Sequence, residues 1–196
     1  MTHRDRRQDI LKAAMELFAK SGFRGTTTRD LAAHAEINEA SIFRYFRTKE
    51  ELYRAILEEK VHESHESHRA ELEQLALSGD DKKFLETLGR TFIERHEQDT
   101  TFMRLLLFSA LEGHELSDMF LSSMGERDPL AQYFQRRIDE GAFRPVDPHL
   151  AARAFFGSFA SFVQWQEIFG LKKSRTFERE HVVQTFVGIF LAGMKA

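Results

Sequence analysis

Side chains able to hydrogen-bond nucleic-acid bases gather in one short segment, Asn38 to Arg44. A guanidinium such as that of Arg44 can bond a guanine edge twice, and a good pair of this kind discriminates by roughly 1–3 kcal/mol. The segment also offers shorter donors and acceptors, and Ala40 leaves room for close approach. We therefore expect bases in a major groove to be read by Asn38, Glu39, Ala40, Ser41 and Arg44. Glu39 either accepts a hydrogen bond from cytosine N4 or only complements a helix dipole.

A second group of side chains around this segment suits phosphate oxygens. The expected phosphate contacts are Thr27, Thr28, Arg29, Tyr45 and Lys49, which would fix the register of the protein on DNA without reading its sequence. Lys49 begins a predicted helix, where the helix dipole disfavours a cation, and a bound phosphate would explain that placement. Thr27 is also expected to cap a helix. The alternative for Tyr45 is a half-buried core position.

No pattern typical of an enzyme is present in the sequence. There is no nucleophile elbow, no phosphate-binding P-loop, no zinc-protease helix motif and no dinucleotide-binding glycine pattern. The chain has no cysteine, which excludes disulfides and thiolate metal sites. His62, His65 and His68 spread over more than half a helical turn, so we expect a solvated face there. We expect no catalytic residue, no metal site and no cofactor.

Two short helices and a tight turn are predicted to position the base-reading segment. Thr27 and Asp30 have the spacing of a capping box, which opens the first helix. Asn38 is a favourable N-cap for the second helix. Its apolar residues, Ile42 and Phe43 among them, face away from the proposed reading side.

These residues resemble the helix-turn-helix of the TetR family of transcriptional regulators. The resemblance covers roughly the first quarter of the chain and rests on GFRGTTTRDLAAHAEINEASIFRYFRTKEEL. It departs from the family pattern at two positions. The turn usually has glycine where this chain has Glu36. Many members have tyrosine where this chain has Phe43, and losing that hydroxyl removes one phosphate contact.

Charge is distributed unevenly along the 196 residues, although the formal net charge is only −3. Residues 1–49 hold ten Lys or Arg against six Asp or Glu, whereas the remainder holds 18 against 25. A basic N-terminal part on an acidic remainder fits a protein that touches DNA with one end. Arg4, Arg6 and Arg7 either stay solvated or add phosphate contacts.

No apolar run is long enough to cross a bilayer, and the first residues lack the apolar segment of a signal peptide. We therefore expect a cytoplasmic protein without a membrane partner. Helical periodicity continues along the rest of the chain. One long helix is predicted over Lys49–Leu77, and the apolar helix Phe102–Leu111 is expected to be buried all round in the body.

The predicted fold is all-α, with about nine helices. Residues 1–50 form a three-helix helix-turn-helix DNA-binding domain, and residues 51–196 form a helical ligand-binding and dimerisation domain. Two apolar helices near the C-terminus, about 148–169 and 177–194, hold more apolar surface than a small body can bury. Their pairing in a homodimer would make a four-helix bundle with a two-fold interface, as the resemblance also implies. The expected interface residues are Phe155, Phe162, Val183, Phe186 and Phe190.

The body is expected to hold a small-molecule effector between its helices. Nineteen phenylalanines favour an apolar or aromatic ligand. Helix positions and the resemblance suggest a pocket lined by Phe92, Phe102, Met103, Leu106, Phe120, Met124, Phe134, Phe159 and Trp165. Each of these is alternatively plain core. The predicted function is a ligand-responsive regulator, a repressor released from a palindromic operator in double-stranded DNA. The alternative is a structural DNA-organising or protein-docking protein without an effector.

Overall fold

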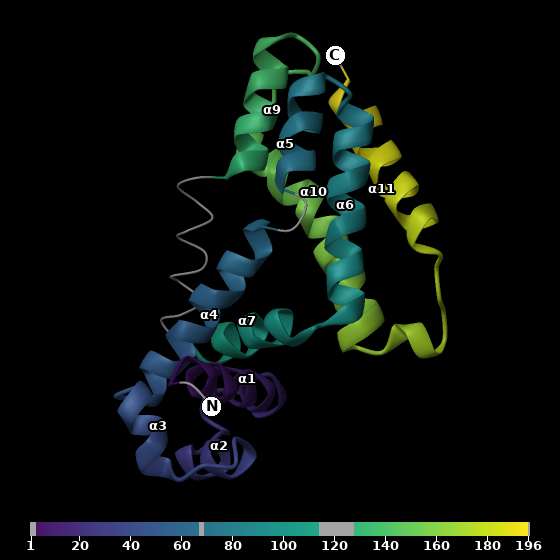
Figure 1. Ribbon diagram of the computed structural model, residues 1–196. Coiled ribbons are helices and arrows are strands. Elements are labelled where there is room, and N and C mark those ends of the chain that lie inside the picture. Colours follow the sequence, from purple (N-terminus) through teal and green to yellow (C-terminus); the bar gives the residue numbers. More distant parts are fainter. Residues whose placement is uncertain (1–2, 67–68, 114–127, 196) are drawn as a thin grey trace. The chain divides into compact units, whose positions relative to one another are not determined.

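The computed structural model describes residues 3–66, 69–113 and 128–195, which are almost entirely helical (Figure 1). These residues form ten α-helices and no β-strand, which confirms the all-α prediction and slightly exceeds the expected count. The helices divide between two compact units. The first unit contains α1–α4 and α7, and the second contains α5, α6 and α9–α11.

The first unit consists of α1 (His3–Ser21), α2 (Thr28–His34), α3 (Glu39–Tyr45), α4 (Lys49–Glu66) and α7 (Thr101–Glu112). Its core includes one side of α1, on which Ile10, Ala14 and Phe18 are buried. Tyr53 of α4 packs edge-on against Phe18, with ring centroids 4.9 Å apart. The Tyr53 hydroxyl donates to the carbonyl oxygen of Leu105 at 3.0 Å, which ties α7 to α4.

The position of α7 corrects one expectation. This helix was predicted to be buried all round in the body, but it packs against α1 in the first unit. Leu111 on its outer side is 84% exposed. An apolar stripe fits either of two cores, so composition alone could not assign this helix to one of them.

The helix predicted over 49–77 is described as two helices, α4 and α5 (Arg69–Ser78), which fall in different units. Residues 67–68 lie outside the described part of the chain.

The second unit adds α6 (Asp81–Gln98), α9 (Pro129–Asp139), α10 (Pro148–Val163) and α11 (Arg179–Met194). A π-helix (Gln164–Ile168) and a 3₁₀-helix (Leu171–Lys173) follow α10. Helix α6 packs against α5, α10 and α11 (Figure 1). A Cβ atom at Gly89 would lie 2.4 Å from the Phe159 ring, so glycine permits the close approach of α6 and α10.

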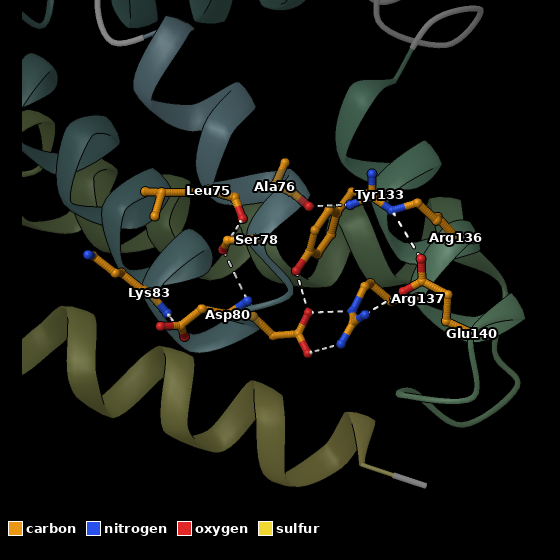
Figure 2. Close-up of polar contacts among 10 residues, drawn as sticks. Leu75, Ala76, Ser78, Asp80, Lys83, Tyr133, Arg136, Arg137 and Glu140 are labelled. Carbon is orange, nitrogen blue, oxygen red and sulfur yellow. Dashed lines mark hydrogen bonds and ion pairs between the residues drawn. The ribbon is translucent and has the colours of Figure 1, made fainter.

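Polar contacts fasten α9 to the α5–α6 junction (Figure 2). Arg137 makes a bidentate ion pair with Asp81, with Nε–Oδ1 and Nη2–Oδ2 distances of 2.7 and 2.9 Å. The Tyr133 hydroxyl donates to the same carboxylate, and Arg136 donates to the carbonyl oxygen of Ala76. Burial and the Asp81 carboxylate raise the pKa of Tyr133.

Candidate nucleic-acid interface

Both predicted caps of the helix-turn-helix are confirmed. The Thr27 hydroxyl accepts from the backbone N–H of Asp30 at 3.1 Å, and the Asp30 carboxylate accepts from the backbone N–H of Thr27 at 3.0 Å. The Thr27 hydroxyl also donates to the Asp30 carboxylate at 2.6 Å, and the two hydrogen bonds that this carboxylate accepts from Thr27 lower the pKa of Asp30. At α3, the Asn38 side chain accepts from the backbone N–H of Ser41 at 2.8 Å. Each helix therefore starts at a fixed residue.

The turn between α2 and α3 contains the one non-glycine residue of the described chain with a positive φ. Glu36 has φ of 54°, the left-handed region that favours glycine. The family's usual glycine at this position therefore has a conformational reason. This chain keeps the turn with a glutamate, at a cost in backbone strain.

The expected base readers lie mostly on the free side of α3. Asn38, Glu39, Ala40 and Arg44 are exposed, and Ile42 beneath them is buried. Ser41 is half-buried, and its hydroxyl donates to the Asn38 side chain at 2.8 Å.

Phe43 is 45% exposed rather than turned into the core with Ile42. It therefore adds an apolar side chain to the free side of α3. Sequence reasoning did not include it in the site, although its family position pointed there.

The expected phosphate contacts have different surroundings. Arg29 is exposed, and Tyr45 is half-buried against the core of the first unit. The Arg44 guanidinium carbon lies 5.4 Å from the centre of the Tyr45 ring. The Thr27 hydroxyl is occupied by its capping role, and the Thr28 hydroxyl donates to Glu39 Oε2 at 2.9 Å.

Lys49 points to the loop between α1 and α2. Its ammonium donates to the carbonyl oxygens of Phe23 and Thr26 at 2.7 and 2.8 Å, and it lies 4.1 Å from the centre of the Phe23 ring. Burial lowers its pKa, which the carboxylates of Glu50 and Glu112 oppose. Two of its three N–H donors are thus used within the chain, which leaves one for another acceptor.

Glu112, at the end of α7, binds the same loop and was not identified from the sequence. Its carboxylate accepts from the backbone N–H groups of Phe23 and Arg24 at 3.0 and 3.1 Å. Gly22, which precedes them, has φ of 73°, and a Cβ there would lie 2.5 Å from Glu112 Oε1. No local signal could reveal this contact, because the partners are 88 and 89 positions apart in sequence.

A hollow of about 290 Å³ lies beside the free side of α3, between this helix and α1. It is lined by Arg6, Ile10, Ile37, Asn38, Ser41, Arg44 and Tyr45. Arg6 thereby joins the α3 side chains. The basic N-terminal part of the chain contributes to the same surface as α3, although the sequence left the role of this arginine open.

In the described part of the chain, the residues expected to line a ligand pocket do not share one cavity. In the second unit Phe134 and Phe159 are fully buried core residues, Phe92 is half-buried, and Trp165 is 55% exposed. Phe102, Met103 and Leu106 belong to the first unit. Phe120, Met124 and the side chains of His62, His65 and His68 lie outside the described residues.

The expected interface residues divide in a similar way. Phe155 and Val183 are 1% and 0% exposed within a single chain, so their side chains offer no surface to a second chain. The periodicity of α10 and α11 identified apolar positions correctly but could not separate the side facing α6 from the outer side. Phe162, Phe186 and Phe190 are half-buried. Among large apolar side chains, the exposed ones in this part of the chain include Leu150, Trp165, Phe169 and Ile189.

The fold and the capped, exposed α3 define a helix-turn-helix DNA-binding protein. The family model for "Bacterial regulatory proteins, tetR family" matches residues 10–56, and that for "AefR-like transcriptional repressor, C-terminal domain" matches residues 83–194. A Bacillus subtilis relative, the uncharacterized HTH-type transcriptional regulator YvkB, is 35% identical over 133 residues, covering 60% of this chain and 67% of its own. The chain belongs to the TetR family of bacterial transcriptional regulators.

Two solved structures share the fold over almost the whole chain. AibR in complex with isovaleryl coenzyme A and operator DNA has a TM-score of 0.74 at 21% identity, covering 94% of this chain and 97% of its own. FadR from Bacillus subtilis in complex with stearoyl-CoA has a TM-score of 0.74 at 18% identity, covering 95% and 98%. The present protein is thus a DNA-binding transcriptional regulator whose C-terminal part matches a repressor domain. In the part of the chain that the structure describes, no helix has the length and apolar character needed to span a membrane.

Proposed function

We propose that this repressor places α3 of each protomer in successive major grooves of a palindromic operator. The observation that carries the proposal is the free side of α3, where Glu39, Ala40 and Arg44 are exposed above the buried Ile42. A short helix with hydrogen-bonding side chains near its N-terminus suits base edges in the major groove. In this arrangement the chain acts in the cytoplasm and catalyses no reaction.

Phosphate contacts then come from the rim of this surface. Arg29 is exposed beside the start of α2, and Lys49 keeps one N–H donor beyond its two carbonyl partners. Arg6, in the hollow next to α3, is a further candidate. Each phosphate contact makes the slope of log affinity against log salt concentration more negative by about 0.9.

The effector in this proposal is a largely apolar molecule, bound by residues of the 51–196 region. An acyl-coenzyme A thioester is the class to test first, because AibR and FadR, which share this fold, hold such ligands in their crystal structures. The phenylalanine-rich composition favours the acyl part of such a ligand, since aromatic side chains surround apolar groups well.

The pairing surface of the homodimer is proposed to be the outer side of α10 and α11. Leu150 and Ile189 are exposed there, Gly157 and Gly188 face open space, and Trp165 is exposed in the π-helix that follows α10. Large apolar groups beside small residues let helices approach closely. Three of the expected interface residues on these helices are half-buried and contribute at the edge of that surface: Phe162, Phe186 and Phe190.

The decisive experiment is selection of bound duplexes from a random DNA pool by the full chain. The affinity of the protein for the most enriched duplex is then measured. We expect an enriched palindrome, bound by one dimer and released by saturating acyl-coenzyme A of a suitable chain length. Weak binding without an enriched sequence would contradict the proposal and favour a structural DNA-organising protein. An enriched palindrome that no thioester releases would contradict only the ligand class.

A further inference from the structure

The first residue of α2 and the first residue of α3 are joined by a hydrogen bond. The Thr28 hydroxyl donates to Glu39 Oε2 at 2.9 Å, across 11 positions of the sequence. Glu39 is exposed, as are Arg29, which follows Thr28 in α2, and Arg44 of α3. The contact therefore orients a carboxylate within the surface proposed to meet DNA.

The other oxygen of this carboxylate is available. Within the described part of the chain, Glu39 Oε1 has no hydrogen-bond partner, and Glu39 forms no ion pair with a lysine or arginine. Glu39 is the first residue of α3. Glu39 thus presents an oriented acceptor with a negative charge. The Thr28 hydrogen is already donated, so Thr28 has no hydroxyl hydrogen left for a phosphate.

Only the exocyclic amino groups of cytosine and adenine donate hydrogen bonds in the major groove. Guanine and thymine present acceptor oxygens there, which repel a carboxylate. Adenine places its own N7 acceptor next to its amino group, whereas the cytosine ring presents its N4 donor and no acceptor of its own in the major groove. A carboxylate on the reading side of α3 therefore favours cytosine over the other three bases.

We propose that Glu39 accepts a hydrogen bond from N4 of a cytosine at one position of each operator half-site, and that Thr28 is the residue that positions it. This inference rests on the proposed binding of α3 in the major groove. It assigns Thr28 to base recognition through Glu39 instead of to a phosphate contact.

The test compares base preferences at every operator position for wild type and variants, by selection from a half-site library. Wild type should prefer cytosine at one position by roughly tenfold, in the range of single-pair discrimination. Glu39→Ala should abolish that preference and leave the other positions unchanged. Glu39→Gln should move the preference to adenine, because an amide can bond adenine N6 and N7 together.

Thr28→Val keeps the shape of the side chain without its hydroxyl, and should weaken the same cytosine preference several-fold. Thr28→Ser restores the hydroxyl and should restore the preference. Glu36→Gln, which changes an exposed glutamate in the neighbouring turn, is the matched control and should leave every preference intact. Melting temperatures of the variants separate a change in recognition from a change in folding.

Two outcomes overturn the inference in distinguishable ways. If wild type enriches a palindrome but Glu39→Ala lowers affinity equally for all sequences, the Thr28–Glu39 bond is only a brace between α2 and α3. If wild type enriches no sequence at all, the proposed operator binding fails together with the inference.

Discussion

Glu112 and Lys49 hold the loop between α1 and α2 through opposite kinds of hydrogen bond. Glu112 accepts from the N–H groups of Phe23 and Arg24, while Lys49 donates to the carbonyl oxygens of Phe23 and Thr26. A residue of α7 and a residue of α4 thus fix the segment that leads into the helix-turn-helix. The geometry of this DNA-binding unit depends on a helix that lies far along the chain.

We expect Glu112→Ala to lower the free energy of unfolding by about 2 kcal/mol, because hydrogen bonds to charged groups contribute about 1.5–3 kcal/mol. Gly22→Ala should also destabilise the protein, by at least about 1 kcal/mol, since its φ of 73° and the nearby Glu112 carboxylate disfavour a side chain. Urea unfolding measures both effects. Leu111→Ala, at an exposed neighbour on α7, is the control and should change stability by less than about 0.5 kcal/mol. Equal stability of Glu112→Ala and wild type would show that the contact does not hold the loop.

Glu36→Gly should stabilise the protein by about 1 kcal/mol. The turn holds Glu36 at φ of 54°, and the left-handed region costs a residue with a side chain roughly 1–2 kcal/mol. Glu36→Ala separates the backbone effect from loss of the carboxylate, because alanine keeps the strain. Thermal unfolding should therefore rank glycine above both alanine and glutamate. A glycine variant no more stable than the alanine variant would contradict the account of strain.

His96 should make stability depend on pH below about 6.5. Burial lowers its pKa below 6.5 and the charge of Arg95 adds to this, against the opposing hydrogen bond to the carbonyl oxygen of Phe92 and the charge of Asp99. The unfolded chain then binds the proton more readily than the folded chain. The contribution of a neutral His96 is complete above pH 6.5 and is lost as the pH falls toward the lowered pKa.

The pH prediction is checked by urea unfolding at pH 7.5 and pH 5.5 for wild type and His96→Asn. The variant cannot titrate at this position, whereas all other histidines remain. Wild type should lose more stability on acidification than the variant. An equal loss in both proteins would show that His96 does not cause the dependence.

Asp81 and Arg137 should be strongly coupled. Their side chains are only 18% and 16% exposed, and removing either partner leaves a poorly hydrated charge. We expect Arg137→Met and Asp81→Asn each to destabilise by about 2–3 kcal/mol, with a coupling energy of about 1–3 kcal/mol in a double-mutant cycle. The i,i+4 pair of Lys82 and Glu86, whose atoms are 3.7 Å apart, is the control and should couple by less than about 0.5 kcal/mol. Coupling of the Asp81 pair no larger than the control would contradict this.

Substitutions at the proposed dimer surface and in the core beneath it should affect different properties, namely dimerisation and folding stability. Trp165→Ser should shift the protein toward monomer with little loss of monomer stability, because this side chain is 55% exposed in the single chain. Phe155→Ala should instead cost about 3–5 kcal/mol of stability, since Phe155 is buried in the core of the second unit. Sedimentation at several concentrations and urea unfolding distinguish the two effects. An unchanged dimer for Trp165→Ser would place the interface elsewhere.

Local signals in the sequence determined the start of each recognition element. The Thr27–Asp30 capping box and the Asn38 cap could both be predicted, because each joins a side chain to backbone within three positions. The family pattern then identified the DNA-binding class.

Only the tertiary structure decided which partners these elements have. Glu112 meets Phe23 across 89 positions, and Thr28 meets Glu39 across a turn, so no short spacing encodes either contact. Phe155 and Trp165 are both aromatic residues of one helical stretch, yet one is core and the other is exposed, because packing against α6 selects a side that periodicity leaves open. The sequence by itself determined where the capped helices α2 and α3 begin and what chemistry α3 presents. Tertiary packing decided which of these side chains are engaged within the protein and which remain available to bind DNA.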